Sequence, residues 1–279
     1  MPGPGCYHRA MQEWPAAPRR RGSRSASRRD VLKCALAAPV LFGLGAAVVA
    51  RGAQEASAAG IQLIDFAERR ILPEEIVAAG YSGVVQYVSE SRPGANFEAK
   101  PLTRQYADAL RAAGLEIVSN YQYGKPGWPT PSDFTRGYDG GVADAQTALR
   151  IHDAAGGSGS APIFFSVDEV IDENTWNTVA VKWFRGINSV LGVDRTGIYG
   201  HFLACGWAIE DGVVGRSTTP GHWWVWQTAA WSQGEREPRA VLYQAVVDNP
   251  ESRGPLLGGI HVDVDDVLAT DYGQWTFDR

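Results

Sequence analysis

The chain has 279 residues, a formal net charge of −5 at pH 7 and three cysteines. Many of its arginines gather before Asp30, so the part that follows is more acidic than the chain as a whole. The sequence of that part indicates no basic surface that could contact a phosphate backbone. We therefore do not expect nucleic acid as a partner.

The first predicted element is an export leader over residues 1–58. Its segment Ser27-Arg28-Arg29-Asp30-Val31-Leu32-Lys33 matches a twin-arginine signal, and an uncharged, mostly apolar run follows over residues 34–50. The small residues Ala56-Ser57-Ala58-Ala59 are of the kind that signal peptidases cleave. We therefore expect the twin-arginine translocase as a partner during export, cleavage near Ala58, and a secreted or envelope-associated protein. A retained membrane anchor is the alternative, although the apolar run is short for a span of about 20 residues.

Residues 59–279 are expected to form a single domain of roughly 220 residues, a size common among α/β barrels. Only Cys205 lies in this part, so no disulfide bond can form within it. Short runs rich in Val, Ile, Phe, Tyr and Trp predict eight buried strands. They lie at residues 61–66, 84–88, 115–121, 162–167, 196–199, 223–227, 241–246 and 260–264.

Helical patterns lie between several of these strands, and each ends close to a glycine. They predict helices at residues 73–79, 102–113, 141–155 and 176–191. Strands that alternate with helices favour a parallel sheet, and eight such units favour an α/β fold closed into a (β/α)₈ barrel with short later helices. A doubly wound sheet is the alternative, and it is disfavoured because no glycine-rich phosphate loop follows the first predicted strand.

Polar side chains lie at the ends of several predicted strands, at the rim where such barrels place their active sites. A single strand-end Asp is commonly a helix cap, but carboxylates on separate strands of one barrel together predict a functional site. Carboxylates with unequal pKa values are what glycoside hydrolysis requires. In chain order, the polar residues are Asp65, Asp168, Glu169, Gln227, Gln244, Asp263 and Asp265.

Aromatic residues lie near the same predicted rim, among them Tyr121, Tyr123 and Trp226. Aromatic rings stack well on sugar rings, and core packing is the alternative explanation for such residues. We expect substrate binding by these three and by Gln227, Gln244 and Asp265.

Several segments, taken with the leader, resemble a known family. Residues 85–89, 92–94, 119–125, 161–168 and 261–268 are similar to the glycoside-hydrolase-like domain, formerly of unknown function, of twin-arginine-exported actinobacterial proteins. That domain is related to family 25 glycoside hydrolases, the barrel lysozymes, and the resemblance extends over nearly all of residues 61–275. It implies a TIM-like barrel that acts on peptidoglycan or another cell-wall glycan.

The resemblance also implies catalytic acids, which it gives as Asp65, Asp168 and Asp263. The barrel lysozymes carry a general-acid Glu two residues after the Asp of the fourth strand. Here that place holds Val170, and the glutamate is Glu169. Side chains of a strand alternate between its faces, so Glu169 faces the cleft only if the strand has already ended.

Two functions remain open on these residues. In a wall-glycan hydrolase, Asp168 or Glu169 would protonate the leaving oxygen. Asp263 would stabilise the developing positive charge or activate water, and Asp65 would bind the sugar. The position of Glu169 motivates the alternative, which is a non-catalytic barrel that binds wall glycan or regulates envelope assembly.

Two other chemistries are disfavoured. Cys205 and His222 could form a Cys-His peptidase pair, but the local pattern lacks the papain-type signature. His261, Asp263 and Asp265 would share one face of a strand, yet they would span about 13 Å, which is too far to hold one metal ion. We therefore expect no metal and no cofactor.

Overall fold

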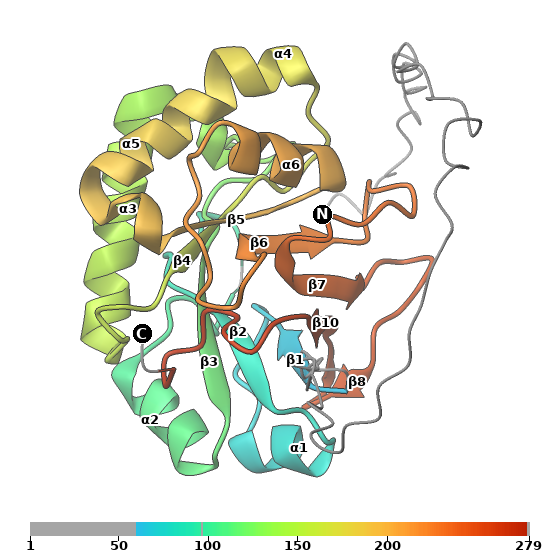
Figure 1. The fold of residues 1–279 in the computed structure, drawn as a ribbon. Coiled ribbons are helices and arrows are strands. Elements are labelled where there is room, and N and C mark those ends of the chain that lie inside the picture. Colours follow the sequence, from blue (N-terminus) through green and yellow to red (C-terminus); the bar gives the residue numbers. More distant parts are fainter. Residues whose placement is uncertain (1–59, 96, 278–279) are drawn as a thin grey trace, which may run out of the picture. The chain divides into compact units, whose positions relative to one another are not determined.

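The computed structural model describes residues 60–95 and 97–277 (Figure 1). The predicted leader over residues 1–58 lies outside this range. No helix in the described part is long and apolar enough to cross a lipid bilayer.

Eight strands close into a barrel in the order β1-β10-β7-β6-β5-β4-β3-β2, which confirms the predicted barrel (Figure 1). Both faces of most strands are covered, so β2 and β5 are buried at every position, including the polar residues Gln86 and Thr196. The strands are β1 (Gln62–Asp65), β2 (Gly83–Tyr87), β3 (Glu116–Tyr121), β4 (Ile163–Ser166), β5 (Thr196–Gly200), β6 (Trp223–Thr228), β7 (Ala240–Val246) and β10 (Asp263–Val267).

The helices follow the first five strands and pack on the outside of the barrel. Glycines allow α3 and α5 to approach closely: a Cβ on Gly141 would lie 2.0 Å from the carbonyl oxygen of Trp183, and one on Gly186 would lie 2.1 Å from that of Tyr138. The helices are α1 (Pro73–Ala78), α2 (Arg104–Ala112), η1 (Asp133–Arg136), α3 (Gly137–Ala155), α4 (Glu173–Thr175), the π-helical turn η2 (Trp176–Ala180), α5 (Val181–Leu191), η3 (Val193–Arg195) and α6 (Phe202–Glu210).

The last strand differs from the prediction. It begins at Asp263 instead of ending near it, and β10 runs antiparallel to both β1 and β7. The preceding residues form a separate two-stranded sheet, β8 (Leu256–Leu257) with β9 (Ile260–His261). The direction of β10 follows from its antiparallel register with β1 and β7, not from the connection alone, because β6 and β7 pair in parallel without a helix between them. The start of β10 therefore lies at the same rim as the end of β1.

Consecutive residues of β4 illustrate the two layers of the core. Phe164 points into the barrel, where its ring meets that of Trp226 edge-on at 6.5 Å. Phe165 points to the helices, where it meets Trp183 of α5 at 5.8 Å. Each fully buried aromatic ring of this kind contributes about 1.5–3 kcal/mol, so both layers hold the rim in place.

Candidate functional site

A cleft of about 210 Å³ lies at the rim where β1 ends and β10 begins. Its walls come from the segments that follow β1, β2 and β3 and from the segment that precedes β10. The structure thus brings Asp65 and Asp263, two of the predicted catalytic residues, to one cleft. The polar residues that line it are Asp65, Glu68, Tyr87, Arg92, Lys100, Gln122, Lys125, Asp248, His261 and Asp263.

Asp65 and Asp263 are bridged by a single side-chain amide. Gln244 on β7 donates from Nε2 to Oδ2 of Asp65 at 2.8 Å and to Oδ2 of Asp263 at 2.9 Å. The Tyr199 hydroxyl donates to Oε1 of Gln244 at 2.8 Å, which fixes the orientation of the amide. Gln244 is itself almost fully buried, so its position suits holding the two carboxyls rather than meeting a substrate.

The surroundings of this pair favour a retained proton. Burial raises the pKa of Asp65, although hydrogen bonds from Gln244 and from the Tyr87 hydroxyl, at 3.0 Å, favour its charged form. Burial also raises the pKa of Asp263, and the neighbouring charge of Asp65 raises it further. Two adjacent buried carboxyls cannot both ionise easily, so the pair keeps a proton toward neutral pH and can donate it.

Asp265 lies one layer deeper in the barrel and does not line the cleft. It is fully buried, and its Oδ1 accepts a hydrogen bond from Nε1 of Trp226 at 2.7 Å. Burial, together with the charge of Asp65, raises the pKa of Asp265 well above its ordinary value. The prediction that Asp265 and Trp226 contact substrate is therefore not supported, because both are sealed inside the barrel.

Asp168 and Glu169 diverge just beyond the end of β4. Oδ2 of Asp168 accepts from Nε2 of Gln122 at 2.7 Å and lies 3.1 Å from the ammonium of Lys125, and both partners line the cleft. The charge of Asp168 also contributes to the raised pKa of Asp65 and of Asp263. Glu169 instead accepts a hydrogen bond from the Ser132 hydroxyl. Neither acid is itself among the residues that line the cleft, and Asp168 meets the cleft through its contacts with Gln122 and Lys125.

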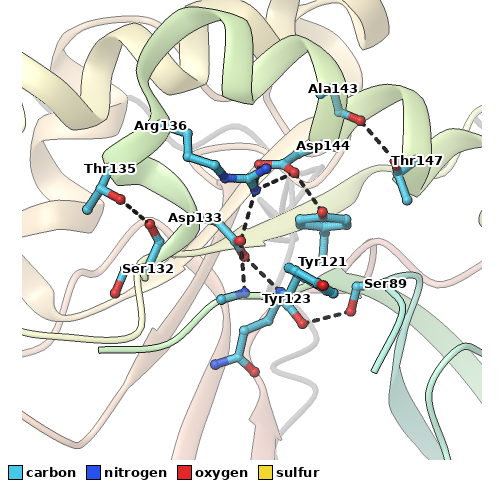
Figure 2. A network of polar contacts seen from close by, with 12 residues as sticks. Ser89, Tyr121, Tyr123, Ser132, Asp133, Thr135, Arg136, Ala143, Asp144 and Thr147 are labelled. Atoms are coloured by element: carbon cyan, nitrogen blue, oxygen red, sulfur yellow. Dashed lines mark hydrogen bonds and ion pairs between the residues drawn. The ribbon is translucent and has the colours of Figure 1, made fainter. Parts of the chain in front are cut away.

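The two tyrosines predicted to bind substrate lie away from the cleft. Tyr121 is buried against the helices, where its hydroxyl donates to Asp144 of α3 at 2.6 Å (Figure 2). Tyr123 is partly buried against the same outer core and does not line the cleft. The period-two alternation of β3 explains this, because Tyr121 shares its face with Ser119, which contacts His152 of α3.

Asp133, Arg136 and Asp144 form a polar cluster beneath the segment that follows β3, here called the Asp133 network. The guanidinium of Arg136 pairs with both aspartates (Figure 2). Asp133 accepts hydrogen bonds from the backbone N–H groups of Tyr123 and Gly124 at 2.7 and 2.8 Å. The network therefore fixes the backbone between Gln122 and Lys125, the two residues that contact Asp168.

Gln227 also differs from its predicted role. It is fully buried, donates to the carbonyl oxygen of Glu235 at 2.8 Å and accepts from the backbone N–H of Glu237 at 2.6 Å. It thus anchors the segment between β6 and β7 and does not line the cleft.

Sequence reasoning missed the cations of the cleft. Arg92, Lys100 and Lys125 lie in segments after strands and not at strand ends, so the positions of the strands do not predict them as cleft residues. Tyr87 was missed as a partner of Asp65, although it is the last residue of β2 and points into the barrel.

The two disfavoured chemistries find no structural support. Cys205 is fully buried in α6, and burial raises the pKa of its thiol well above the ordinary value, so a reactive thiolate is not favoured. Nδ1 of His222 contacts the carbonyl oxygen of Ala240 at 2.9 Å. Across residues 60–95 and 97–277, no group of three or more His, Cys, Asp or Glu side chains is arranged to hold a metal ion.

Known proteins share this fold and much of the sequence. Residues 74–267 match the family described as Rv2525c-like, glycoside hydrolase-like domain. The Mycobacterium tuberculosis protein Rv2525c, whose name proposes a peptidoglycan hydrolase, is 37% identical over 254 residues that cover 90% of this chain and 99% of that protein. Crystal structures of Rv2525c, a Tat-secreted protein, with L-tartrate and with HEPES are 36% identical and superpose with TM-scores of 0.69 and 0.67, covering 77% of this chain and 98% of theirs. The chain therefore belongs to the Rv2525c-like family of glycoside hydrolase-like domains.

Proposed function

We propose that the chain is an exported hydrolase of peptidoglycan or another cell-wall glycan. The observation that carries the proposal is the pair formed by Asp65 and Asp263 on the amide of Gln244. A buried carboxyl pair that keeps a proton can protonate a glycosidic oxygen near neutral pH. Family membership supports the substrate class, because the name of the relative Rv2525c proposes a peptidoglycan hydrolase.

The surroundings of each acid support a division of roles. Asp263 is the proton donor, because burial and the charge of Asp65 both raise its pKa. Asp65 carries the negative charge that keeps this proton in place, and the Tyr87 hydroxyl stabilises that charge. Asp168, held beside the cleft by Gln122 and Lys125, stabilises the positive charge that develops on the sugar as the glycosidic bond breaks.

Glycan turnover tests this proposal. Protein recovered after export is incubated with purified peptidoglycan from acidic to mildly alkaline pH, and released reducing ends are measured. We expect release by the wild type and its loss in Asp168→Asn and Asp263→Asn. Absence of released fragments at every pH would overturn the hydrolase proposal.

Export through the twin-arginine pathway belongs to the same proposal, and it is supported by the Tat-secreted relative. Cleavage near Ala58 would leave the barrel whole, because β1 begins at Gln62. N-terminal sequencing of protein from the culture medium and envelope checks the cleavage position. Replacement of Arg28 and Arg29 by Lys should leave the precursor uncleaved inside the cell.

A second candidate is a barrel that binds wall glycan without cleaving it. The position of Glu169, hydrogen-bonded to Ser132 and outside the cleft lining, favours this candidate over a lysozyme-like mechanism. Binding to wall material that survives Asp168→Asn, with no released reducing ends from the wild type, would support it.

A further inference from the structure

The cleft has one strongly basic side. Arg92 and Lys100 come from the segment between β2 and α2, and Lys125 comes from the segment after β3. We call these three residues the cationic wall. They share the cleft with Asp65 and Asp263, so one small volume holds both a proton-donating pair and a concentration of positive charge.

Arg92 is ordered by aromatic rings on two sides. Its guanidinium carbon lies 4.4 Å from the ring centroid of Trp128 and 4.9 Å from that of Phe97, and the residue is only 5% exposed. Such cation–π contacts hold a guanidinium in a fixed plane and remove part of its water shell. Arg92 therefore needs little further ordering to bind an anion.

Lys100 is a nearly buried cation. Its Nζ donates to the carbonyl oxygen of Gln122 at 2.9 Å and lies 3.8 Å from the ring centroid of Tyr87. Lys100 takes part in none of the ion pairs formed by the described residues. A buried ammonium without a carboxylate partner is unfavourable, and it has three N–H donors to satisfy. Burial and the nearby charge of Arg92 lower the pKa of Lys100 to about 7, against the opposing charges of Asp168 and Asp133, so Lys100 is only partly charged at neutral pH and a bound anion would favour its charged form. An anion in the cleft would relieve this cost.

Lys125 links the cationic wall to the predicted catalytic machinery. Its side chain is 45% exposed, and its ammonium lies 3.1 Å from Oδ2 of Asp168. An anion bound at the wall would therefore be placed close to Asp168, and the sugar that carries the anion would be brought to the carboxyl groups.

We propose that the cationic wall binds a carboxylate of the wall polymer, so that the cleft selects acidic glycans over neutral ones. This inference rests on the proposed glycan substrate and names its chemical class. A planar carboxylate has two oxygens, one for the guanidinium of Arg92 and one for the ammonium of Lys100. The carboxylate is carried either by a sugar of the chain or by a peptide attached to it.

Binding of defined probes tests the inference. By calorimetry, the exported protein is titrated with a peptide-free tetrasaccharide of alternating N-acetylglucosamine and N-acetylmuramic acid, and with the same compound after reduction of its carboxyls to alcohols. A tetrasaccharide whose muramic acid carboxyls carry a peptide as amides, so that its free carboxylates belong to the peptide alone, forms the third arm. We expect about tenfold or greater weakening when all carboxyls are removed. If the affinity is lost in the reduced probe and recovered in the peptide-bearing probe, the bound carboxylate belongs to the peptide. If the affinity stays low in the peptide-bearing probe, the bound carboxylate belongs to the sugar. Equal binding of all three probes would overturn the inference.

Matched variants connect the preference to the cationic wall. Lys100→Met and Lys125→Met should remove the preference for the acidic probe, and Lys100→Arg should retain part of it. Lys182→Met, which alters an exposed lysine of α5, should leave it unchanged. If Lys100→Met does not fold, as judged by thermal unfolding, Lys125→Met carries the test, because its side chain is half exposed. A preference that persists in Lys125→Met and in every folded Lys100 variant would overturn the assignment.

Turnover of the same probes separates this inference from the proposed hydrolase. Equal cleavage of the acidic and the reduced glycan would refute the carboxylate site and leave the hydrolase intact. Selective binding of the acidic probe through Lys100, without cleavage of any probe, would support the carboxylate site and refute the hydrolase.

Discussion

Asp65 and Asp263 face each other across an antiparallel strand pair and accept hydrogen bonds from the same nitrogen of Gln244. The direction of β10 creates this relationship. If β10 ran parallel to β1, the first residue of β10 would lie at the opposite rim, far from the last residue of β1. One reversed strand therefore converts two separate carboxyls into a neighbouring pair, in which the charge of Asp65 raises the pKa of Asp263.

The first prediction concerns proton donation by this pair. Asp263→Asn should lower glycan turnover by about a hundredfold or more, because a positioned general acid commonly contributes that much and an amide cannot donate in the same way. The Asn oxygen can accept the hydrogen bond from the backbone N–H of Asp248, but its amide nitrogen then faces Nε2 of Gln244 and loses that bond, so thermal unfolding of the variant is measured alongside. Reducing ends released from peptidoglycan are the measurement.

Asp266→Asn is the matched control for this variant. It lies on the same strand but toward the opposite rim, where Asp266 accepts from Nε2 of Gln62 at 2.9 Å. Its turnover should stay close to that of the wild type. Equal losses in the two variants would show that the effect is structural and would remove Asp263 from the proposed mechanism.

The second prediction concerns pH and the buried Asp265. Its pKa is raised in the folded state, so the unfolded chain releases this proton near pH 4 while the folded chain keeps it. The free energy of unfolding therefore falls as pH rises above about 4, by up to about 1.4 kcal/mol per pH unit for this one group, until Asp265 ionises in the folded protein. Asp265→Asn stays neutral in both states, so its stability relative to the wild type should rise with pH.

Urea unfolding at a series of pH values from 4 to 8 measures this difference. If the free energies of unfolding of wild type and Asp265→Asn differed by the same amount at every pH from 4 to 8, Asp265 would already be ionised in the folded barrel. That result would contradict the expected effect of its burial.

Much of the barrel was predictable because its strands are buried on both faces. Continuous apolar runs such as the one around β2 give a strong signal whatever their direction. The last strand was placed wrongly because its residues alternate, Asp263, Val264, Asp265, and composition does not encode strand direction. The absence of a helical pattern in residues 247–262 does not decide the direction either, because β6 and β7 pair in parallel although residues 229–239 between them form no helix.

The sequence predicts cleft residues best where a side chain lies at a strand terminus on this rim and points inward, as Asp65 does at the end of β1 and Asp263 at the start of β10. Asp65 satisfies both conditions, whereas Tyr121 and Gln227 end strands but point outward or into a loop. Strict alternation counted from a known inward residue could have separated these cases. Lys100 could not have been found in this way, because a long segment after β2 carries it and tertiary contacts with Gln122 and Tyr87 fix its place.

The third prediction concerns the Asp133 network. Asp133→Ala removes the acceptor for the N–H groups of Tyr123 and Gly124 and leaves them unsatisfied, so it should lower the free energy of unfolding by about 2 kcal/mol. It should also lower kcat more than it changes KM, because Gln122 and Lys125 would no longer hold Asp168 in place. Chemical unfolding and steady-state kinetics below the unfolding transition measure the two effects.

Asp139→Ala is the control for this network, because Asp139 is an exposed residue in the first turn of α3. Its effect on stability should stay below about 1 kcal/mol, the usual value of a charge at a helix N-terminus. A loss of stability in Asp133→Ala without any change in kcat would mean that the network supports the fold but does not position Asp168.

The fourth prediction compares two adjacent acids with one chemical change. Asp168→Asn should abolish most turnover, because it removes the negative charge proposed to stabilise the sugar cation. Glu169→Gln should retain most turnover, because an amide oxygen still accepts the hydrogen bond from Ser132 and the side chain, unlike that of Asp168, is not bonded to the cleft residues Gln122 and Lys125. Both variants lose a single negative charge within two neighbouring residues, so general effects of charge on substrate binding cancel in the comparison. Loss of turnover in Glu169→Gln with retention in Asp168→Asn would reverse the assignment and would require Glu169 to turn into the cleft when glycan binds.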